Sequence, residues 1–164
     1  MCPLGKCKLA FIGVVGTSST TYTRLKGFTE LTQSKNPKEY SRQYVDEETE
    51  RTDIIGYAPE LSYAFDEFED NAAQKVITDI TNNELIGDAA KVDIIIVDLS
   101  RESKTSGSFE AVKRTFSVIP DSEGDSTDAY TYSGTLKANG EKVFGTAASG
   151  TEGSWLTCTF TEAE

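Results

Sequence analysis

The spacing of apolar and polar residues predicts a chain that is mostly extended. Residues 8–15 and 24–30 are apolar enough to form strands. Residues 54–65 alternate in the way expected of a half-buried strand, with an interruption at Pro59, because proline has no amide proton to donate to a sheet. The first half of the chain therefore predicts strands separated by polar stretches.

The most apolar segment is KVDIIIVDLS, residues 91–100. Its even-numbered apolar side chains from Val92 to Ile96 face one way, and its odd-numbered ones from Ile95 to Leu99 face the other. Because both faces are apolar, we expect this strand to be covered on both sides and to lie at the centre of a sheet.

Strand patterns continue to the C-terminus, at residues 110–119, 130–138, 141–146 and 155–160. Asn139-Gly140 separates the second of these from the third. An Asn-Gly pair between two strands is a strong signal for a tight hairpin, so we expect the two flanking segments to pair with each other.

Residues 70–83 predict one amphipathic helix, with Asp70 placed to cap it. Its apolar residues recur at helical spacing: Ala72, Ala73, Val76, Ile77 and Ile80. The elements together predict a mainly β fold with one helix (α+β), a two-sheet antiparallel β-sandwich or barrel with a flanking α-helix and a long extended loop. No internal repeat is visible, and we expect residues 1–164 to form a single domain.

The long extended loop is the stretch from Lys35 to Asp53. Ten of its nineteen residues carry charge, and its sizeable apolar side chains are Tyr40, Tyr44 and Val45. Such a segment cannot bury itself against its own domain. A structureless insertion of this length is usually either functional or disordered, and both interpretations stay open at this point.

The charge of the chain narrows the classes of function. A net charge of -11 repels a phosphate backbone, so a DNA-binding surface is not expected. The balance is +5 through Val45 and -16 from Asp46 onward. In a self-assembling protein a basic arm and an acidic body could meet head to tail, and the alternative is a solvated surface that keeps the protein in solution.

The sequence contains few residues that could form a catalytic, metal or cofactor site. The chain has no histidine, which excludes Ser-His and Cys-His nucleophiles and mixed Cys/His zinc sites. Its three cysteines, Cys2, Cys7 and Cys158, predict free thiols rather than a disulfide framework. The glycines of residues 13–19 match neither a phosphate-binding loop nor a dinucleotide fingerprint. We therefore expect no metal, no cofactor and no enzymatic activity.

Two clusters of acidic residues are candidate sites. Asp121, Glu123, Asp125 and Asp128 lie close together in residues 119–130, but they lack the ligand spacing of an EF-hand loop, so a solvated turn is favoured over a bound cation. The acids of residues 66–70 precede the predicted helix, where they stabilise the positive end of its dipole.

The chain contains no apolar run of the roughly 18 to 20 residues needed to span a bilayer. Its N-terminal apolar stretch is also too short and too interrupted by glycine for a signal peptide. We therefore expect the protein to be made and kept in the cytoplasm, with no membrane partner.

Several idiosyncratic strings point to a family: NPKEYSRQYVDE with TERTDIIGY, the helix with VITDI, KVDIIIVDL, IPDSEGDSTDAYTYSG ahead of the Asn-Gly pair, and a terminal CTFT strand. In this order they resemble the tail tube proteins (major tail proteins) of phages and prophages of Gram-positive bacteria. The resemblance runs from about Lys8 to the C-terminus.

This resemblance implies a structural virion protein whose copies form hexameric rings. The inner sheets of a ring join into a barrel around a lumen, and stacked rings make the tube through which DNA is ejected. The implied partners are other copies of the chain, the tail initiator or tip proteins, the terminator and the tape measure protein in the lumen. DNA is present only in transit. The protein would be assembled in the host cytoplasm and reside in the virion.

In such a tube the stretch from Lys35 to Asp53 would be an inter-subunit loop that orders on assembly. Tyr40 and Tyr44 are its expected anchors, and Arg42 and Arg51 would pair with acids across the joint. The full expected interface set is Lys35, Lys38, Tyr40, Arg42, Tyr44, Asp46, Glu47 and Arg51. Loops at the ring ends are expected at Asp121, Glu123, Asp125, Asp128, Asn139 and Gly140, and residues 1–8 are expected to be a flexible arm.

An acidic lumen would let DNA slide without binding. The alternative function is a monomeric immunoglobulin-like or carbohydrate-binding β-sandwich module, in which the charged stretch is only a flexible loop. That module would need an exposed aromatic platform, for which Trp155, Tyr130, Tyr132 and Tyr57 are candidates, although their strand patterns favour core positions. Concentration-dependent self-association would distinguish the tube from the module.

Overall fold

The structure is a computed structural model that describes residues 7–15, 21–125, 127–151 and 153–164. In these ranges the chain forms strands, one α-helix and one 3-10 turn. In chain order they are β1 (Lys8–Val14), β2 (Thr21–Arg24), β3 (Phe28–Ser34), β4 (Pro37–Arg42), β5 (Arg51–Tyr57), β6 (Glu60–Asp66), α1 (Ala72–Asn82), η2 (Gly87–Ala90), β7 (Lys91–Glu102), β8 (Ser108–Asp125), β9 (Tyr130–Ala138), β10 (Val143–Ser149) and β11 (Thr157–Glu162).

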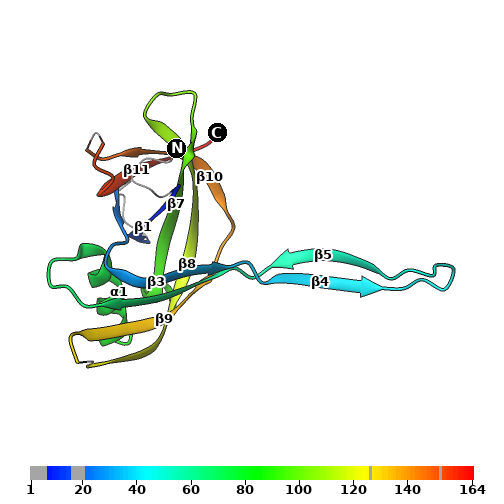
Figure 1. The fold of residues 1–164 in the computed structure, drawn as a ribbon, viewed down its shortest axis with the longest axis horizontal. Helices are drawn as coiled ribbons and strands as arrows, with labels where there is room; N and C mark the ends of the chain where they lie inside the picture. Colours follow the sequence, from blue (N-terminus) through cyan, green and yellow to red (C-terminus); the bar gives the residue numbers. More distant parts are fainter. Residues whose placement is uncertain (1–6, 16–20, 126, 152) are drawn as a thin grey trace.

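Nine of these strands form one antiparallel sheet in the order β10-β11-β2-β1-β7-β8-β9-β6-β3, and β10 also pairs with β8. The first part of β8 pairs with β10, from Ser108 to Lys113, and the second part pairs with β9, from Phe116 to Asp125. The pairing of β8 with β10 closes β1, β2, β7, β8, β10 and β11 into a barrel. The remaining strands β9, β6 and β3 extend the sheet away from this barrel (Figure 1).

One hydrophobic core fills the barrel. It consists of Leu9, Phe11, Tyr22, Ile95, Val97, Leu99, Ala111, Ala147, Trp155, Cys158 and Phe160. The Trp155 ring lies 6.3 Å from the ring of Phe11 and 5.5 Å from that of Phe109. Trp155 is therefore a core residue, as its pattern favoured, although it precedes β11 with a φ of 46° instead of lying in the strand.

A second core lies between α1 and the other face of the sheet. Its buried residues include Leu61, Tyr63, Phe65, Ile77, Val92, Ile94, Phe116, Tyr132 and Leu136. Strand β7 contributes Val92 and Ile94 to this core and Ile95 and Val97 to the barrel core. The prediction that this strand is central and covered on both faces is confirmed.

The helix was predicted with the right extent but the wrong cap. Asn71, and not Asp70, is the N-cap, and its side chain accepts a hydrogen bond from the Gln74 amide at 3.3 Å. The buried Gln74 side chain accepts from the Phe68 amide at 2.9 Å and donates to the carbonyls of Asp66 and Gly27. This amide ties the start of α1 to the end of β6 and to the turn before β3.

Two of the predicted strands are each divided. Residues 24–30 contain the end of β2 and the start of β3, separated by a turn in which Gly27 has a φ of 73°. Residues 54–65 belong to β5 and β6, which are separated at Ala58 and Pro59. Only β6 alternates between buried and half-buried positions as predicted, because β5 lies outside the core.

The predicted Asn139-Gly140 hairpin is wrong. Strands β9 and β10 do not pair with each other, because both run along the same edge of β8. Asn139 stays bonded to that strand: its amide donates to the Thr115 carbonyl at 2.8 Å, and its side chain donates to the Ser117 hydroxyl at 2.8 Å. Neither Asn139 nor Gly140 has the positive φ that a type I′ turn requires.

The predicted class is confirmed: the fold is mainly β and antiparallel, with one flanking α-helix. Cys158 is free, as predicted, and it is buried; Cys7 is disulfide-bonded, so the prediction of free thiols is wrong there. In the described part of the chain, no helix is long and apolar enough to cross a membrane. The predicted arm over residues 1–8 lies outside the described residues except for Cys7 and Lys8, and Lys8 begins β1.

Candidate functional site

The most distinctive surface is a hairpin of β4 and β5 that projects from the body of the molecule (Figure 1). Its strands pair antiparallel from Pro37 opposite Tyr57 to Arg42 opposite Arg51, and they form a sheet separate from the nine-stranded one. None of residues 35–57 is buried. The stretch predicted to be a long extended loop therefore lies in a β-hairpin that has no core of its own and whose register shifts between Lys38 and Glu39.

The hairpin continues the ribbon of β3 and β6. Those two strands pair as far as Ser34 opposite Glu60, and the next pair along the ribbon is Pro37 with Tyr57. At the junction Asn36 has a φ of 44°, its carbonyl accepts from the Ala58 amide at 3.1 Å, and its side chain donates to the Ala58 carbonyl at 3.2 Å. These contacts fix the direction in which the hairpin leaves the body.

The tip of the hairpin, residues 43–50, is ordered by its own polar contacts. The Gln43 side-chain amide donates to the carbonyls of Glu47 and Glu48, at 3.2 and 3.3 Å. The Glu47 amide donates to the Tyr44 carbonyl at 3.0 Å, and the Glu47 carboxylate pairs with Arg51. The tip therefore has a defined shape although it projects away from the body (Figure 1).

Four of the predicted interface residues form one cluster beside the tip. The guanidinium groups of Arg42 and Arg51 lie 5.7 and 6.0 Å from the centre of the Tyr44 ring, within the range of cation–π attraction. Arg42 also donates to the Tyr40 hydroxyl at 3.2 Å. The other predicted residues lie along the same hairpin: Lys35, Lys38, Asp46 and Glu47. Their role in an interface remains a prediction.

Sequence reasoning missed the apolar part of this surface. Ile54, Ile55 and Tyr57 of β5 are 58%, 66% and 59% exposed, and they add to the exposed Tyr40 and Tyr44. The alternation of residues 54–65 predicted a half-buried strand. The adjacent charged stretch was the sequence signal that could have predicted the exposure of β5, because it leaves this strand no core to pack against. Apolar side chains gathered on an unsupported ribbon are typical of an interaction surface.

A second surface is the face of β3, β6, β9 and the end of β8 that is turned away from α1. Leu61 and Tyr63 point into the core under the helix, so the intervening Ser62 points to the opposite face. That face is mostly polar, and a shallow pocket on it is lined by residues that include Glu30, Ser62, Thr135 and Lys137.

This part of the sheet has two edges without a neighbouring strand in the described chain. Strand β3 pairs only with β6. On β8 the pairing with β7 stops at Ser117, so one edge of its last residues is free. Free edges can pair with a strand of another chain.

The predicted ring-end residues are not all in loops. Asp121, Glu123 and Asp125 lie on β8 and are exposed, and only Asp128 lies in the connection to β9. Asn139 and Gly140 form the bend described above. Among the described residues, no group of three acids, cysteines or histidines is arranged to hold a metal ion.

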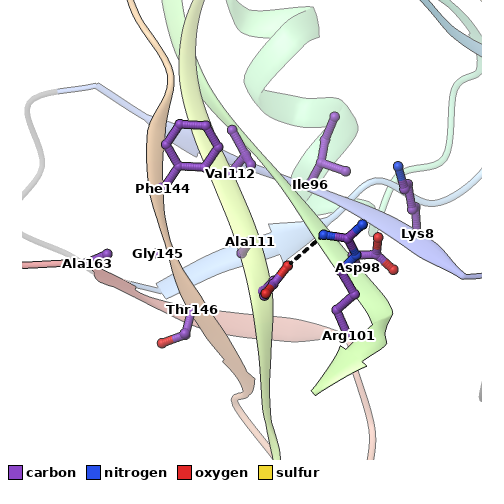
Figure 2. Close-up of a pocket in the computed structure, with 11 residues that line it drawn as sticks. Lys8, Ile96, Asp98, Arg101, Ala111, Val112, Phe144, Gly145, Thr146 and Ala163 are labelled. Carbon is purple, nitrogen blue, oxygen red and sulfur yellow. Dashed lines mark hydrogen bonds and ion pairs between the residues drawn. The ribbon is translucent and has the colours of Figure 1, made fainter. Parts of the chain in front are cut away.

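Figure 2 shows an open groove on the barrel, of about 490 Å³, lined by strands β1, β7, β8 and β10. Ile96, Val112 and Phe144 form its apolar side, and the charged groups around it include the ion pair of Arg101 with Glu110 at 3.4 Å. A hydrogen bond from the Ser100 hydroxyl lowers the pKa of Asp98, which stays a carboxylate. Among the described residues that line this groove, no nucleophile is paired with a base.

The aromatic candidates for a carbohydrate platform are dispersed. Trp155 and Tyr132 are buried in the two cores, and Tyr130 packs edge-on against Tyr132 at 5.3 Å. Tyr57 is exposed but lies on the hairpin. These four aromatic side chains therefore do not form one flat surface on the body.

Comparisons with solved structures support the fold. The chain is similar to a subunit of the SPP1 tail tube, solved by solid-state NMR and cryo-EM, with a TM-score of 0.59 and 15% identity over 87% of this chain and 78% of that one. It is also similar to a chain of the tail of an empty GTA particle with C6 symmetry, with a TM-score of 0.59 and 12% identity over 85% of this chain and 96% of that one. No protein-family model and no curated protein matches the sequence.

Proposed function

We propose that this chain is the subunit of a phage tail tube, of the type found in phages and prophages of Gram-positive bacteria. Copies form hexameric rings, and stacked rings make the conduit for DNA ejection. The observation that carries the proposal is the fold shared with the SPP1 tail tube over 87% of the chain and with the tail of a GTA particle over 85% of it. The protein would then reside in the virion after assembly in the host cytoplasm, next to tail tip, terminator and tape measure proteins.

The two free sheet edges support closure into a ring. Strand β3 of one copy would lie beside the end of β8 of the next, so that the four-stranded parts of the sheets join around a lumen. This arrangement pairs both exposed edges, which would otherwise favour aggregation. It also places the polar face toward the lumen and α1 toward the outside.

The hairpin supports contact between rings. It exposes Tyr40 and Tyr44 beside two arginines, and Tyr and Arg are the residue types that most often dominate binding energy at interfaces. Since the hairpin has no core of its own, docking on a neighbouring copy is what would bury these side chains.

The test is negative-stain electron microscopy of concentrated protein, with light scattering on the same sample and with tail-tip proteins added as initiators. Hollow rings or tubes are the expected result. The double variant Tyr40→Ala with Tyr44→Ala should keep the circular dichroism of the wild type but fail to form tubes, whereas Phe68→Ala, at an aromatic side chain that is 57% exposed elsewhere, should assemble normally. A strict monomer under all these conditions would refute the proposal.

A further inference from the structure

Three cations converge at the root of the hairpin. Lys35, Arg114 and Lys142 line a cavity of about 440 Å³ together with Tyr57 and Pro59. The ion pairs seen in the described part of the chain involve other residues, and the buried Nε of Arg114 has no hydrogen-bond partner. In a chain with a net charge of -11, a cluster of cations that no carboxylate neutralises is unexpected.

The electrostatics of this basic cavity favour an anion. Partial desolvation lowers the pKa of the Lys35 ammonium, and the charges of Lys142, Arg114 and Lys8 lower it further. The charged groups that shift this pKa are all cations, so the Lys35 ammonium is repelled by its charged neighbours. A negatively charged group in the cavity would relieve that repulsion and supply an acceptor for Arg114.

The opposite end of the same hairpin carries the complementary charge. Asp46, Glu47, Glu48 and Glu50 lie at the tip, where Glu47 is neutralised by Arg51. The remaining three carboxylates, Asp46, Glu48 and Glu50, are exposed and form none of the ion pairs found among the described residues. Three unpaired acids at the tip thus match three unpaired cations at the root.

The tip cannot reach the cavity of its own chain. About ten residues separate root from tip, and at roughly 3.3 Å per residue the two ends lie on the order of 30 Å apart. The hairpin runs straight away from the body and does not fold back (Figure 1). The matching charges can therefore meet only between two copies.

From this placement we infer that the acidic tip of one copy, Asp46, Glu48 and Glu50, docks into the basic cavity of a second copy, formed by Lys35, Arg114 and Lys142. The inference rests on the proposed tube, because each copy carries both halves of the joint, the acidic tip of its hairpin and the basic cavity at the hairpin root, and a head-to-tail contact of this kind repeats from copy to copy. Charge pairs of this type fix the register of an interface. A carboxylate of the same chain is favoured over a nucleic-acid phosphate because the strongly negative protein repels nucleic acid.

The first test neutralises the tip. The variant D46N/E48Q/E50Q should raise the protein concentration needed for tube growth by roughly tenfold or more at about 0.15 M salt, as loss of close charge pairs predicts. The matched control E67Q/E69Q/E84Q removes the same charge at exposed positions away from both ends of the hairpin and should assemble like the wild type.

The second test exchanges the charges. E48K/E50K and K35E/K142E should each block assembly alone, and the combination of all four substitutions in one chain should restore it. Arg114 is left unchanged in these variants because its partly buried side chain could affect folding, whereas Lys35 and Lys142 are exposed. Circular dichroism of each variant confirms that the fold is intact.

The outcomes separate the inference from the proposed function. If the wild type and D46N/E48Q/E50Q form tubes equally well, the inferred contact between tip and cavity is wrong, while the proposed tube is supported. If the wild type never assembles, even with tail-tip proteins, both fail. If inorganic phosphate or a short DNA duplex binds the wild type and K35E/K142E abolishes that binding while the tip variant assembles normally, the cavity serves another anion and the inference is overturned.

Discussion

At the scale of single residues, the two cores each hold a side chain that ionises only with difficulty. Cys158 lies in the barrel with no exposed surface, and Tyr63 lies beneath α1 with 2% exposed. Burial raises the pKa of each to about 12, from ordinary values of 9.0 for the thiol and 10.0 for the phenol. The free energy of unfolding must therefore depend on pH in the alkaline range.

For Cys158 the direction follows from the two states. Below about pH 9 the thiol is protonated in the folded and in the unfolded protein, so its burial contributes fully to the free energy of unfolding. Above that pH the unfolded chain releases the proton while the folded protein keeps it. The free energy of unfolding therefore falls as pH rises toward the folded-state pKa of about 12. Between pH 7 and pH 10.5 the loss is up to about 2 kcal/mol. Urea unfolding of the wild type and of Cys158→Ala at both pH values measures it.

The Cys158→Ala variant keeps Tyr63 and the other titrating groups, so it is the reference for the part of the pH dependence that Cys158 does not cause. The decrease in the free energy of unfolding between the two pH values should be smaller for Cys158→Ala than for the wild type by that amount. Equal decreases in the two proteins would mean that the native thiol ionises as readily as the unfolded one.

Residue types in the sequence were enough to pick out the members of the hairpin cluster, but not their arrangement. Tyr40, Arg42, Tyr44 and Arg51 stood out because they are aromatic or cationic in a stretch without a core. Arg114 could not be found in this way, since it lies in the alternating pattern of β8 and approaches Lys35 only through the fold. A contact between distant parts of the chain has no local sequence signature.

At the scale of elements, prediction succeeded where local pattern and tertiary pairing agree. Strand β7 was identified as central because its two apolar faces are both used. The Asn139-Gly140 turn failed because β9 and β10 each pair with a third strand, and a local turn signal does not report on such competition. Strand β5 was given a half-buried face because alternation indicates an extended backbone without showing what covers it.

The hairpin as an element should contribute little to the stability of its own subunit. Replacing residues 38–56 with Asn-Gly would join Pro37 to Tyr57 by a two-residue turn, and the Asn36–Ala58 contacts would remain. Because none of the removed side chains is buried, the free energy of unfolding should change by less than about 1 kcal/mol. Urea unfolding measures this change, and light scattering should show that assembly is lost.

A matched deletion tests whether this effect is specific. Shortening the loop between β7 and β8 by removing residues 104–106 changes another exposed connection and should leave assembly intact. If the truncated hairpin variant instead loses several kcal/mol, the hairpin packs on its own body in solution, and its proposed docking on a neighbour is wrong.

At the scale of the whole molecule, the cores, the hairpin and the polar sheet face are separate parts of the structure. The barrel and the helix-covered sheet supply the two cores, the hairpin carries acids at its tip beyond a basic cavity at its root, and the polar sheet face has no element of the described chain over it. In the proposed tube, the strongly negative balance of the chain would let DNA cross the lumen without binding, because fixed acids repel phosphates. The proposed orientation of that face can be tested through its charge.

Two lysines placed on the polar face should turn the tube into a DNA-binding one. Thr32 of β3 and Thr135 of β9 lie in one row across that face, separated by Ser62 of β6, and neither threonine side chain forms a hydrogen bond recorded among the described residues. Thr32→Lys with Thr135→Lys should leave tube assembly unchanged. It should let preformed tubes retain a short fluorescent DNA duplex at low salt, with release as salt rises, since phosphate binding is salt-dependent.

The matched control places the same charges outside the proposed lumen, as Thr159→Lys with Thr161→Lys on exposed positions of β11. Tubes of this variant gain equal charge but should retain far less duplex than tubes of the first, because a lumen surrounds DNA with several subunits at once and the outer wall does not. If the two variants retain DNA equally, or if only the β11 lysines do, the face turned away from α1 does not line the lumen and the ring must close around another surface.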